Sequence, residues 1–247
     1  MHSTTQRIGH TVIKTARLDD IELLTDSAQA TMTEANIYLI LRKHDRIANY
    51  LYISPLQNLL VLEFYPHGNL KAYSREHGTK RLTIWARQMI EGVAYIHKKG
   101  VIHADVRLDQ WLVDSNLDAR LSDFNASGHD SHSELDIASA KGTGVERASH
   151  FMPRDPLEDN TVKTDLFALG SALYELETGE YPYAEEDDER IAQFFSEGQF
   201  PNTSDLMLGK LIKGCWMGTF ETADDVLAAG DYIWPNAESG WPSCVPS

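Results

Sequence analysis

Two aspartates lie at the two ends of one short predicted hairpin. Asp105 belongs to the segment HADVRLDQ at 103–110, and Asp123 begins the segment DFN at 123–125. Between them, mainly apolar stretches at 111–114 and 119–122 flank a polar turn at 115–118, a pattern typical of two strands joined by a turn. The hairpin therefore brings the two acidic groups together. Phosphoryl transfer needs such a pair, because one acid accepts a hydroxyl proton while the other holds a metal ion.

The two segments resemble the catalytic loop H-R-D-L-x-x-x-N and the D-F-G motif of protein kinases. The resemblance implies that Asp105 is the catalytic base and that Asp123 and Gln110 bind Mg²⁺. Arg107 stands where serine/threonine kinases usually place a lysine, so the resemblance implies that it neutralises the transferring phosphate. The structural alternatives are a hairpin with two solvated aspartates and a surface salt bridge for Arg107.

Three positions depart from the family's motifs: Ala104 replaces arginine, Gln110 replaces asparagine and Asn125 replaces glycine. Without the arginine, ordering of the activation segment by phosphorylation is not expected to operate. Gln110 keeps the amide oxygen of asparagine but moves it outward by one methylene, and Asn125 has less backbone freedom than glycine. At the A-P-E position, Arg154 replaces glutamate and the family's arginine partner is also missing, so that ion pair is expected to be lost.

The N-terminal part resembles the nucleotide-binding elements of kinases. The β-branched stretch at 11–15 resembles the V-A-I-K strand, which implies that Lys14 binds the α- and β-phosphates; the alternative is an exposed strand lysine. Residues 31–47 are predicted to form a helix with Thr33 as a possible cap. It resembles helix C and places Glu34 opposite Lys14, the alternative being a first-turn glutamate favoured by the helix dipole. Only 13 residues precede Lys14, with Gly9 the one glycine among them, so the glycine-rich loop is expected to be missing or reduced to one strand.

The apolar run at 59–64 predicts a buried strand that leads into a linker broken by proline and glycine. By resemblance this is the kinase hinge. It would place Leu62 at the back of an adenine pocket, and the backbone from Glu63 to Tyr65 would hydrogen-bond the base. A plain core strand explains the side chains equally well.

Further along the chain, apolar residues at helical spacing predict a core helix at 82–98. Residues 164–176 resemble helix F, in which Asp165 would cap the backbone of the catalytic loop; a helix N-cap is the alternative. Cys215 and Trp216 resemble a core pair of the last kinase subdomain, and 223–229 is predicted to be the final helix. The resemblance is closest to divergent fungal kinases.

The amino-acid composition limits the kinds of partner that the chain is expected to bind. The 22 basic and 37 acidic residues leave a formal net charge of −15, which opposes binding to nucleic acid or to an anionic membrane. Two cysteines do not make a disulfide framework, and no apolar run reaches the length of a membrane span. With no signal-peptide pattern at the N-terminus, a soluble, cytoplasmic protein is expected.

Together these features predict an α+β, bilobal, kinase-like fold. A small N-lobe would cover 1–65, a larger helical C-lobe 66–233 and a tail 234–247. The first functional hypothesis is a kinase that transfers the γ-phosphoryl group of ATP, with Mg²⁺, to a serine or threonine of a protein substrate. The second is a pseudokinase that acts as a binding or scaffolding module. The third is a small-molecule phosphotransferase, which the helix-F and Cys215–Trp216 matches disfavour. The sequence does not specify an oligomeric state.

Overall fold

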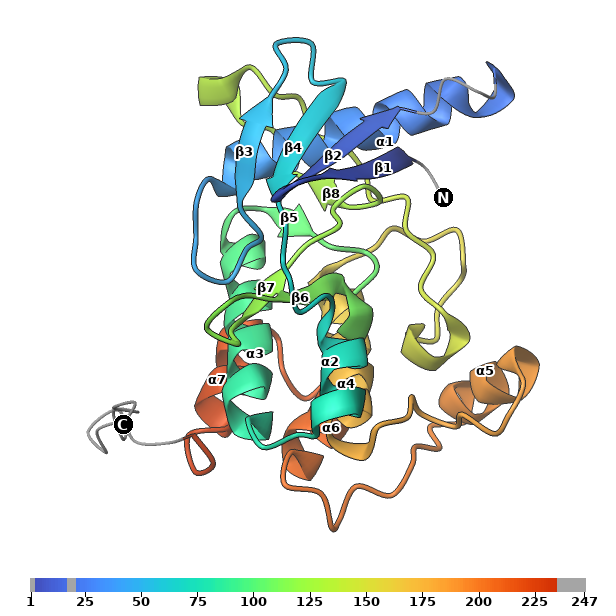
Figure 1. Ribbon diagram of the computed structural model, residues 1–247. Helices are drawn as coiled ribbons and strands as arrows, with labels where there is room; N and C mark the ends of the chain where they lie inside the picture. Colours follow the sequence, from blue (N-terminus) through green and yellow to red (C-terminus); the bar gives the residue numbers. More distant parts are fainter. Residues whose placement is uncertain (1–2, 17–20, 235–247) are drawn as a thin grey trace, which may run out of the picture.

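The computed structural model describes residues 3–16 and 21–234, which form two unequal parts (Figure 1). The smaller part is an antiparallel sheet with the strand order β1-β2-β4-β3, and α1 packs against it. Its elements are β1 (Ser3–Ile8), β2 (Thr11–Ala16), α1 (Ile21–Leu41), β3 (Tyr50–Ile53) and β4 (Leu59–Glu63).

The larger part is mainly helical. Two short ladders, β5 with β8 and β6 with β7, lie between the sheet and the helices (Figure 1). Its elements are α2 (Leu70–His77), α3 (Leu82–Lys98), β5 (Val101–Ile102), β6 (Trp111–Val113), β7 (Ala119–Leu121), β8 (Gly128–His129), α4 (Val162–Thr178), α5 (Asp188–Ser196), α6 (Gly209–Trp216) and α7 (Ala223–Ala229). The predicted α+β, bilobal fold is confirmed, and so is the hairpin of β6 and β7; the limits given for the lobes stay predictions.

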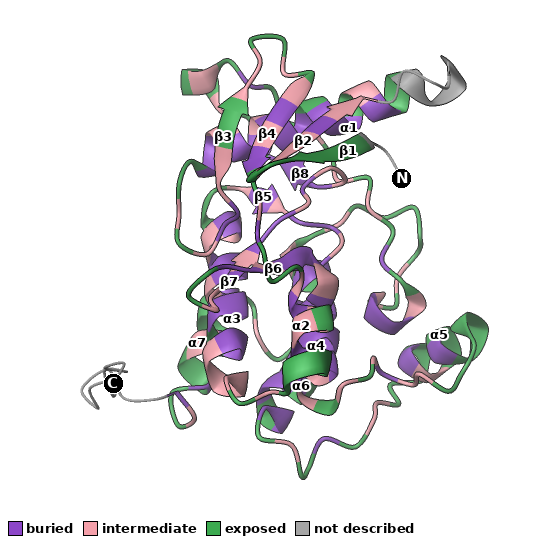
Figure 2. Ribbon diagram, viewed as in Figure 1, coloured by how far each residue is buried: buried purple, intermediate pink, exposed green. Residues whose placement is uncertain are grey.

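The helical core forms where apolar residues recur with helical period. Helix α3 spans the predicted residues, and α4 is buried along nearly its whole length between α3 and α6 (Figure 2). Trp216 stacks on Phe200 with ring centroids 5.5 Å apart, and its indole N–H donates to the Ser171 hydroxyl at 2.9 Å. The predicted core role of Cys215 and Trp216 is confirmed, because both side chains are buried and the polar atom of the indole is satisfied.

Helix α1 differs from its prediction at both ends. It begins at Ile21 and ends at Leu41, so Thr33 is not a cap and Glu34 lies in the helix interior. Residues 25–30 lack apolar periodicity, yet they contain no glycine or proline to interrupt a helix. The end comes from Arg42, whose φ of 57° is left-handed and whose amide donates to the Tyr38 carbonyl.

The C-terminal end of the described chain is also packed. Trp234, which the predicted tail includes, is buried, and its indole N–H donates to the Leu227 carbonyl at 2.9 Å. The rest of the predicted tail, 235–247, lies outside the described residues. Within the described ranges, no helix combines the length and apolarity needed to cross a membrane.

Candidate active site

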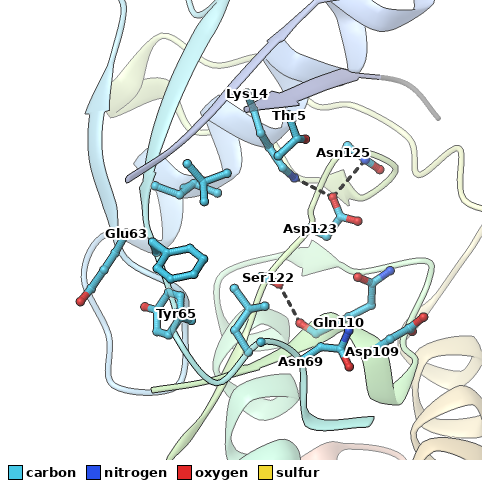
Figure 3. Close-up of a pocket in the computed structure, with 15 residues that line it drawn as sticks. Thr5, Lys14, Glu63, Tyr65, Asn69, Asp109, Gln110, Ser122, Asp123 and Asn125 are labelled. Carbon is cyan, nitrogen blue, oxygen red and sulfur yellow. Dashed lines mark hydrogen bonds and ion pairs between the residues drawn. The ribbon is translucent and has the colours of Figure 1, made fainter. Parts of the chain in front are cut away.

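A pocket of about 460 Å³ lies between the sheet and the helical part, beside the connection from β4 to α2 (Figure 3). Six of the predicted site residues line it: Lys14, Leu62, Glu63, Tyr65, Gln110 and Asp123. The other three, Glu34, Asp105 and Arg107, do not line the pocket, but each contacts a residue that does.

Lys14 joins three elements at the upper edge of this pocket. From β2, its Nζ lies 2.8 and 2.9 Å from the two carboxylate oxygens of Glu34 on α1, and 2.7 Å from Oδ1 of Asp123 (Figure 3). The predicted pairing of Lys14 with Glu34 is present. The alternatives of an exposed strand lysine and a first-turn glutamate are wrong, since both side chains are buried and Glu34 lies mid-helix.

The electrostatics of this group follow from its burial. Burial raises the pKa of Glu34, and the charge of Lys14 only partly offsets the effect. Burial would also raise the pKa of Asp123, but the charge and hydrogen bond of Lys14 outweigh it and hold that pKa below its usual value. Asp123 therefore stays ionised at neutral pH, which is the state needed to bind a cation.

Aromatic packing sets the position of Asp123. The adjacent Phe124 is fully buried, with its ring edge-on to Tyr38 of α1 at 5.4 Å and tilted against His103 at 5.2 Å. Asp123 itself has a left-handed φ of 67°. Helix α1, the 123–125 segment and the start of the catalytic loop are thus packed as one unit, so a movement of α1 would displace Asp123.

Asp165 binds the backbone at the start of the catalytic loop, the 103–110 segment. Its carboxylate accepts the backbone N–H of His103 at 2.7 Å and that of Ala104 at 2.9 Å, and it lies 2.9 Å from the His97 ring nitrogen. The N-cap of α4 is Thr161, whose hydroxyl accepts from Thr164 N, so the N-cap alternative for Asp165 is wrong. The acid instead satisfies two buried donors of an irregular loop.

Asp105 is surrounded by donors from its own loop. Arg107 contacts both of its oxygens, Nε to Oδ1 at 2.7 Å and Nη2 to Oδ2 at 2.8 Å, and also reaches Asp109 at 3.1 Å. The Gln110 amide donates to Oδ2 of Asp105 at 2.9 Å. This forked contact orients the carboxylate. The surface-salt-bridge alternative for Arg107 does not describe it, because the side chain is only 17% exposed.

Backbone contacts join the two motifs. The carbonyl of Gln110 accepts both the N–H and the hydroxyl of Ser122, which places Gln110 beside Asp123 (Figure 3). Asn125 donates its amide to Asp123 Oδ1 at 3.0 Å. The left-handed residue of this segment is Asp123, whereas Asn125 has an ordinary φ. The glycine that the family carries at position 125 is therefore not required by the backbone here.

In the predicted hinge, Glu63 to Tyr65, backbone groups rather than side chains are available to bind a base. The Glu63 carboxylate points away from the pocket (Figure 3) and accepts from the Asn49 amide, while the Tyr65 hydroxyl accepts the Asn49 N–H. The amides of Glu63 and Phe64 already donate to the carbonyls of Asn49 and His10. Of the three hinge amides, that of Tyr65 is the candidate donor to a base.

The stretch between the 123–125 segment and α4, called the activation segment here, contains an ion pair that the sequence did not indicate. Arg154 Nη2 lies 3.0 and 3.2 Å from the oxygens of Glu146, and Asn160 donates to the same carboxylate at 3.1 Å. This is not the family's pair, whose loss was expected, but a different one. Arg154 has acquired a partner eight residues upstream, and both side chains are almost fully buried.

Comparison with known proteins identifies the class. A family model described as protein tyrosine and serine/threonine kinase matches residues 3–223, so the chain belongs to the protein kinase family. It is 29% identical over 150 residues to mitogen-activated protein kinase kinase kinase 3 of Arabidopsis thaliana, covering 60% of this chain and 26% of that protein. It is 28% identical over 213 residues to the serine/threonine-protein kinase mos of Patiria pectinifera, covering 78% and 59%.

A third relative is protein kinase C eta type of Mus musculus, 27% identical over 177 residues, covering 70% of this chain and 26% of that protein. The chain thus spans about a quarter to three fifths of the length of these relatives. Family membership agrees with the kinase hypothesis and disfavours the small-molecule phosphotransferase. The predicted closeness to fungal kinases and the missing glycine-rich loop stay predictions.

Proposed function

We propose that this domain transfers the γ-phosphoryl group of ATP to a serine or threonine hydroxyl of a protein substrate. The observation that carries the proposal is the contact of Lys14 with both Glu34 and Asp123, which joins β2, α1 and the 123–125 segment at one point of the pocket. A buried lysine between two carboxylates is a costly arrangement. This arrangement is expected where a polyphosphate and its metal ion bind at the same place.

The residues present fit Mg²⁺-ATP. Among the described residues no cluster of three His, Cys, Asp or Glu side chains could hold a metal alone, but Mg²⁺ commonly takes one or two protein oxygens and completes its shell with phosphates and water. Asp123 and the amide oxygen of Gln110 would supply those protein oxygens. When bound, the ion would neutralise charge on the phosphate oxygens. Val12, Leu62 and Leu112 give the pocket apolar walls for a base.

Asp105 is assigned the role of catalytic base, and Arg107 that of neutralising the transferring phosphate. The forked contact between them fixes the orientation of the Asp105 carboxylate. Arg107 stays charged throughout, because arginine does not lose its proton in proteins. A shift of its guanidinium toward a phosphate would free one carboxylate oxygen for the hydroxyl proton.

The test is thermal stabilisation by Mg-ATP, followed on the same samples by transfer of labelled phosphate to one acidic and one basic generic protein. The variants are Asp123→Ala and Asp105→Ala. The control is Asp224→Ala, which removes an exposed carboxylate that pairs with Lys98 on the surface. Stabilisation should require Asp123, and transfer should require both aspartates but not Asp224.

If millimolar Mg-ATP gives neither stabilisation nor transfer, the kinase proposal fails and the chain is better described as a pseudokinase that binds partners. Stabilisation without transfer to either protein would leave a nucleotide-binding module. Transfer that survives Asp105→Ala would remove Asp105 from the role of base.

A further inference from the structure

Arg147 lies at the rim of the candidate active site. It precedes the 3₁₀ turn Ala148–His150 in the activation segment, and its Nη2 lies 3.8 Å from Oδ2 of Asp109, a residue that lines the pocket. The side chain is 55% exposed, compared with 17% for Arg107 and 20% for Lys71. Of these three described cations beside the catalytic loop, Arg147 is the most exposed, and its contact with a carboxylate is long.

The acids nearby already hold cations of this chain. Asp105 and Asp109 share Arg107 at 2.7 to 3.1 Å, and Glu175 of α4 binds Lys71 at 2.7 Å. Because these contacts are short and partly buried, a basic group on a substrate would have to break one of them. The charge of Arg147 is not neutralised to the same extent.

A buried histidine lies close enough to these cations to be affected by their charges. His150 is 2% exposed, and burial followed by the charges of Arg107, Arg147 and Lys71 lowers its pKa to about 3. Of the three cations that act on His150, Arg107 and Lys71 are already paired with carboxylates at short distance. Arg147 is the one of the three whose charge is least offset.

Three acids of the acidic run at 185–189 have a structural role at the start of α5. Asp187 is the N-cap of α5, with its carboxylate accepting the Arg190 amide at 2.8 Å, and Asp188 and Glu189 occupy the first turn. Acids at these positions stabilise a helix start. These three acids are therefore explained by the helix they begin.

We propose that Arg147 determines substrate specificity by binding an anionic group next to the acceptor hydroxyl. That group would be the carboxylate of an aspartate or glutamate, or a phosphate already present on the peptide, since a guanidinium forms forked hydrogen bonds with either. The proposal rests on the proposed function. It adds the class of substrate: peptides that are acidic, rather than basic, around the phosphorylated residue.

The experiment compares serine peptides that carry aspartate, phosphoserine, alanine or arginine at each position flanking the acceptor. The kcat/KM of each is measured for the wild type, Arg147→Ala and Arg147→Glu. Arg87→Glu is the matched control, because Arg87 is also exposed and pairs with Glu91 within α3, away from the catalytic loop. Binding of the aspartate and arginine peptides to the same proteins, with a non-hydrolysable Mg-ATP analogue present, is measured in parallel by fluorescence anisotropy.

We expect the wild type to prefer one acidic peptide over its alanine counterpart by about fivefold, mostly through KM, as for an accessible ion pair. Arg147→Ala should abolish this preference and Arg147→Glu should reverse it toward arginine, while Arg87→Glu leaves it unchanged. A phosphoserine preference without an aspartate preference would identify phosphate as the group recognised. Transfer with no acidic preference, or a preference that survives Arg147→Glu, overturns the inference and leaves the proposed function intact. No transfer to any peptide overturns the proposed function, and equal binding of aspartate and arginine peptides then overturns the inference separately.

Discussion

Removing one partner of the Glu146–Arg154 pair should cost far more stability than removing both. In Glu146→Met, the Arg154 guanidinium would keep its charge at 6% exposure with no carboxylate, and Asn160 would lose an acceptor. Arg154→Met would leave Glu146, 1% exposed, without its cation, so that its carboxyl either stays charged or takes up a proton, each at a cost. It would also remove the stacking of the guanidinium on Phe151, 4.3 Å from the ring centroid. Each single change is expected to cost about 3–5 kcal/mol, the range for an uncompensated buried charge.

The double variant should recover most of that loss. With methionine at both positions no charge is buried, and the apolar side chains have volumes suited to the space. Even the wild-type pair is incompletely satisfied, because the buried Arg154 Nε has no hydrogen-bond partner within the described part of the chain. The double variant is expected within about 2 kcal/mol of the wild type, which gives a coupling of at least about 4 kcal/mol between the two sites.

The assay is urea unfolding of the four proteins, followed by tryptophan fluorescence. The m value serves as a check that the same surface is exposed in each case. Losses that simply add in the double variant would refute the reasoning, and so would single losses below about 1 kcal/mol, the level of a surface salt bridge. Either result would mean that the pair is accessible to water in solution.

Three further predictions use the same unfolding measurement. Tyr38→Phe should raise the free energy of unfolding by about 1 kcal/mol, because the Tyr38 hydroxyl is buried with no hydrogen-bond partner among the described residues; a loss would reveal a hidden partner. His150→Gln should make the free energy of unfolding less dependent on pH. With a folded pKa of about 3 against 6.5 unfolded, His150 contributes full stability above pH 6.5 and loses about 1.4 kcal/mol per unit below it, so the drop from pH 6.5 to 5 should shrink by about 2 kcal/mol; an unchanged slope would contradict the assignment. Ala104→Gly should stabilise by about 0.5–1 kcal/mol, because Ala104 has a left-handed φ of 65°; a decrease would show that its methyl group matters more than its backbone.

The elements that the sequence predicted well are those whose signal is local. The apolar residues of α3 recur with helical period over its whole length, so its limits were predicted correctly. Helix α1 ends because Arg42 adopts a left-handed φ that arginine rarely takes, and no residue type marks such an end. The apolar residues of its first turn, Ile21, Leu23 and Leu24, are followed by a stretch at 25–30 without apolar periodicity, so its beginning could not be predicted either.

The contacts of the candidate site also differ in how well the sequence predicts them. The pairing of Lys14 with Glu34 could be predicted, because a strand motif and a helix carry it in a recognisable order. The Glu146–Arg154 pair could not, since both residues belong to an irregular segment whose burial depends on how it packs on α4. Arg147 was missed for a related reason: only the fold brings residue 147 beside Asp109.

The altered motif positions are each compensated by a neighbour in the fold. Ala104 is fully buried, and a Cβ added to Gly144 would lie 2.2 Å from the carbonyl oxygen of Ala104. The activation segment therefore occupies the space beside Ala104. The amide of Gln110 donates to Asp105, and that of Asn125 donates to Asp123. Two of the three substitutions therefore contact an acid whose position they influence, and the third lets the activation segment pack directly on the catalytic loop. Because each compensation uses groups already within contact distance, the geometry of the site can persist after the family's usual residues have been replaced.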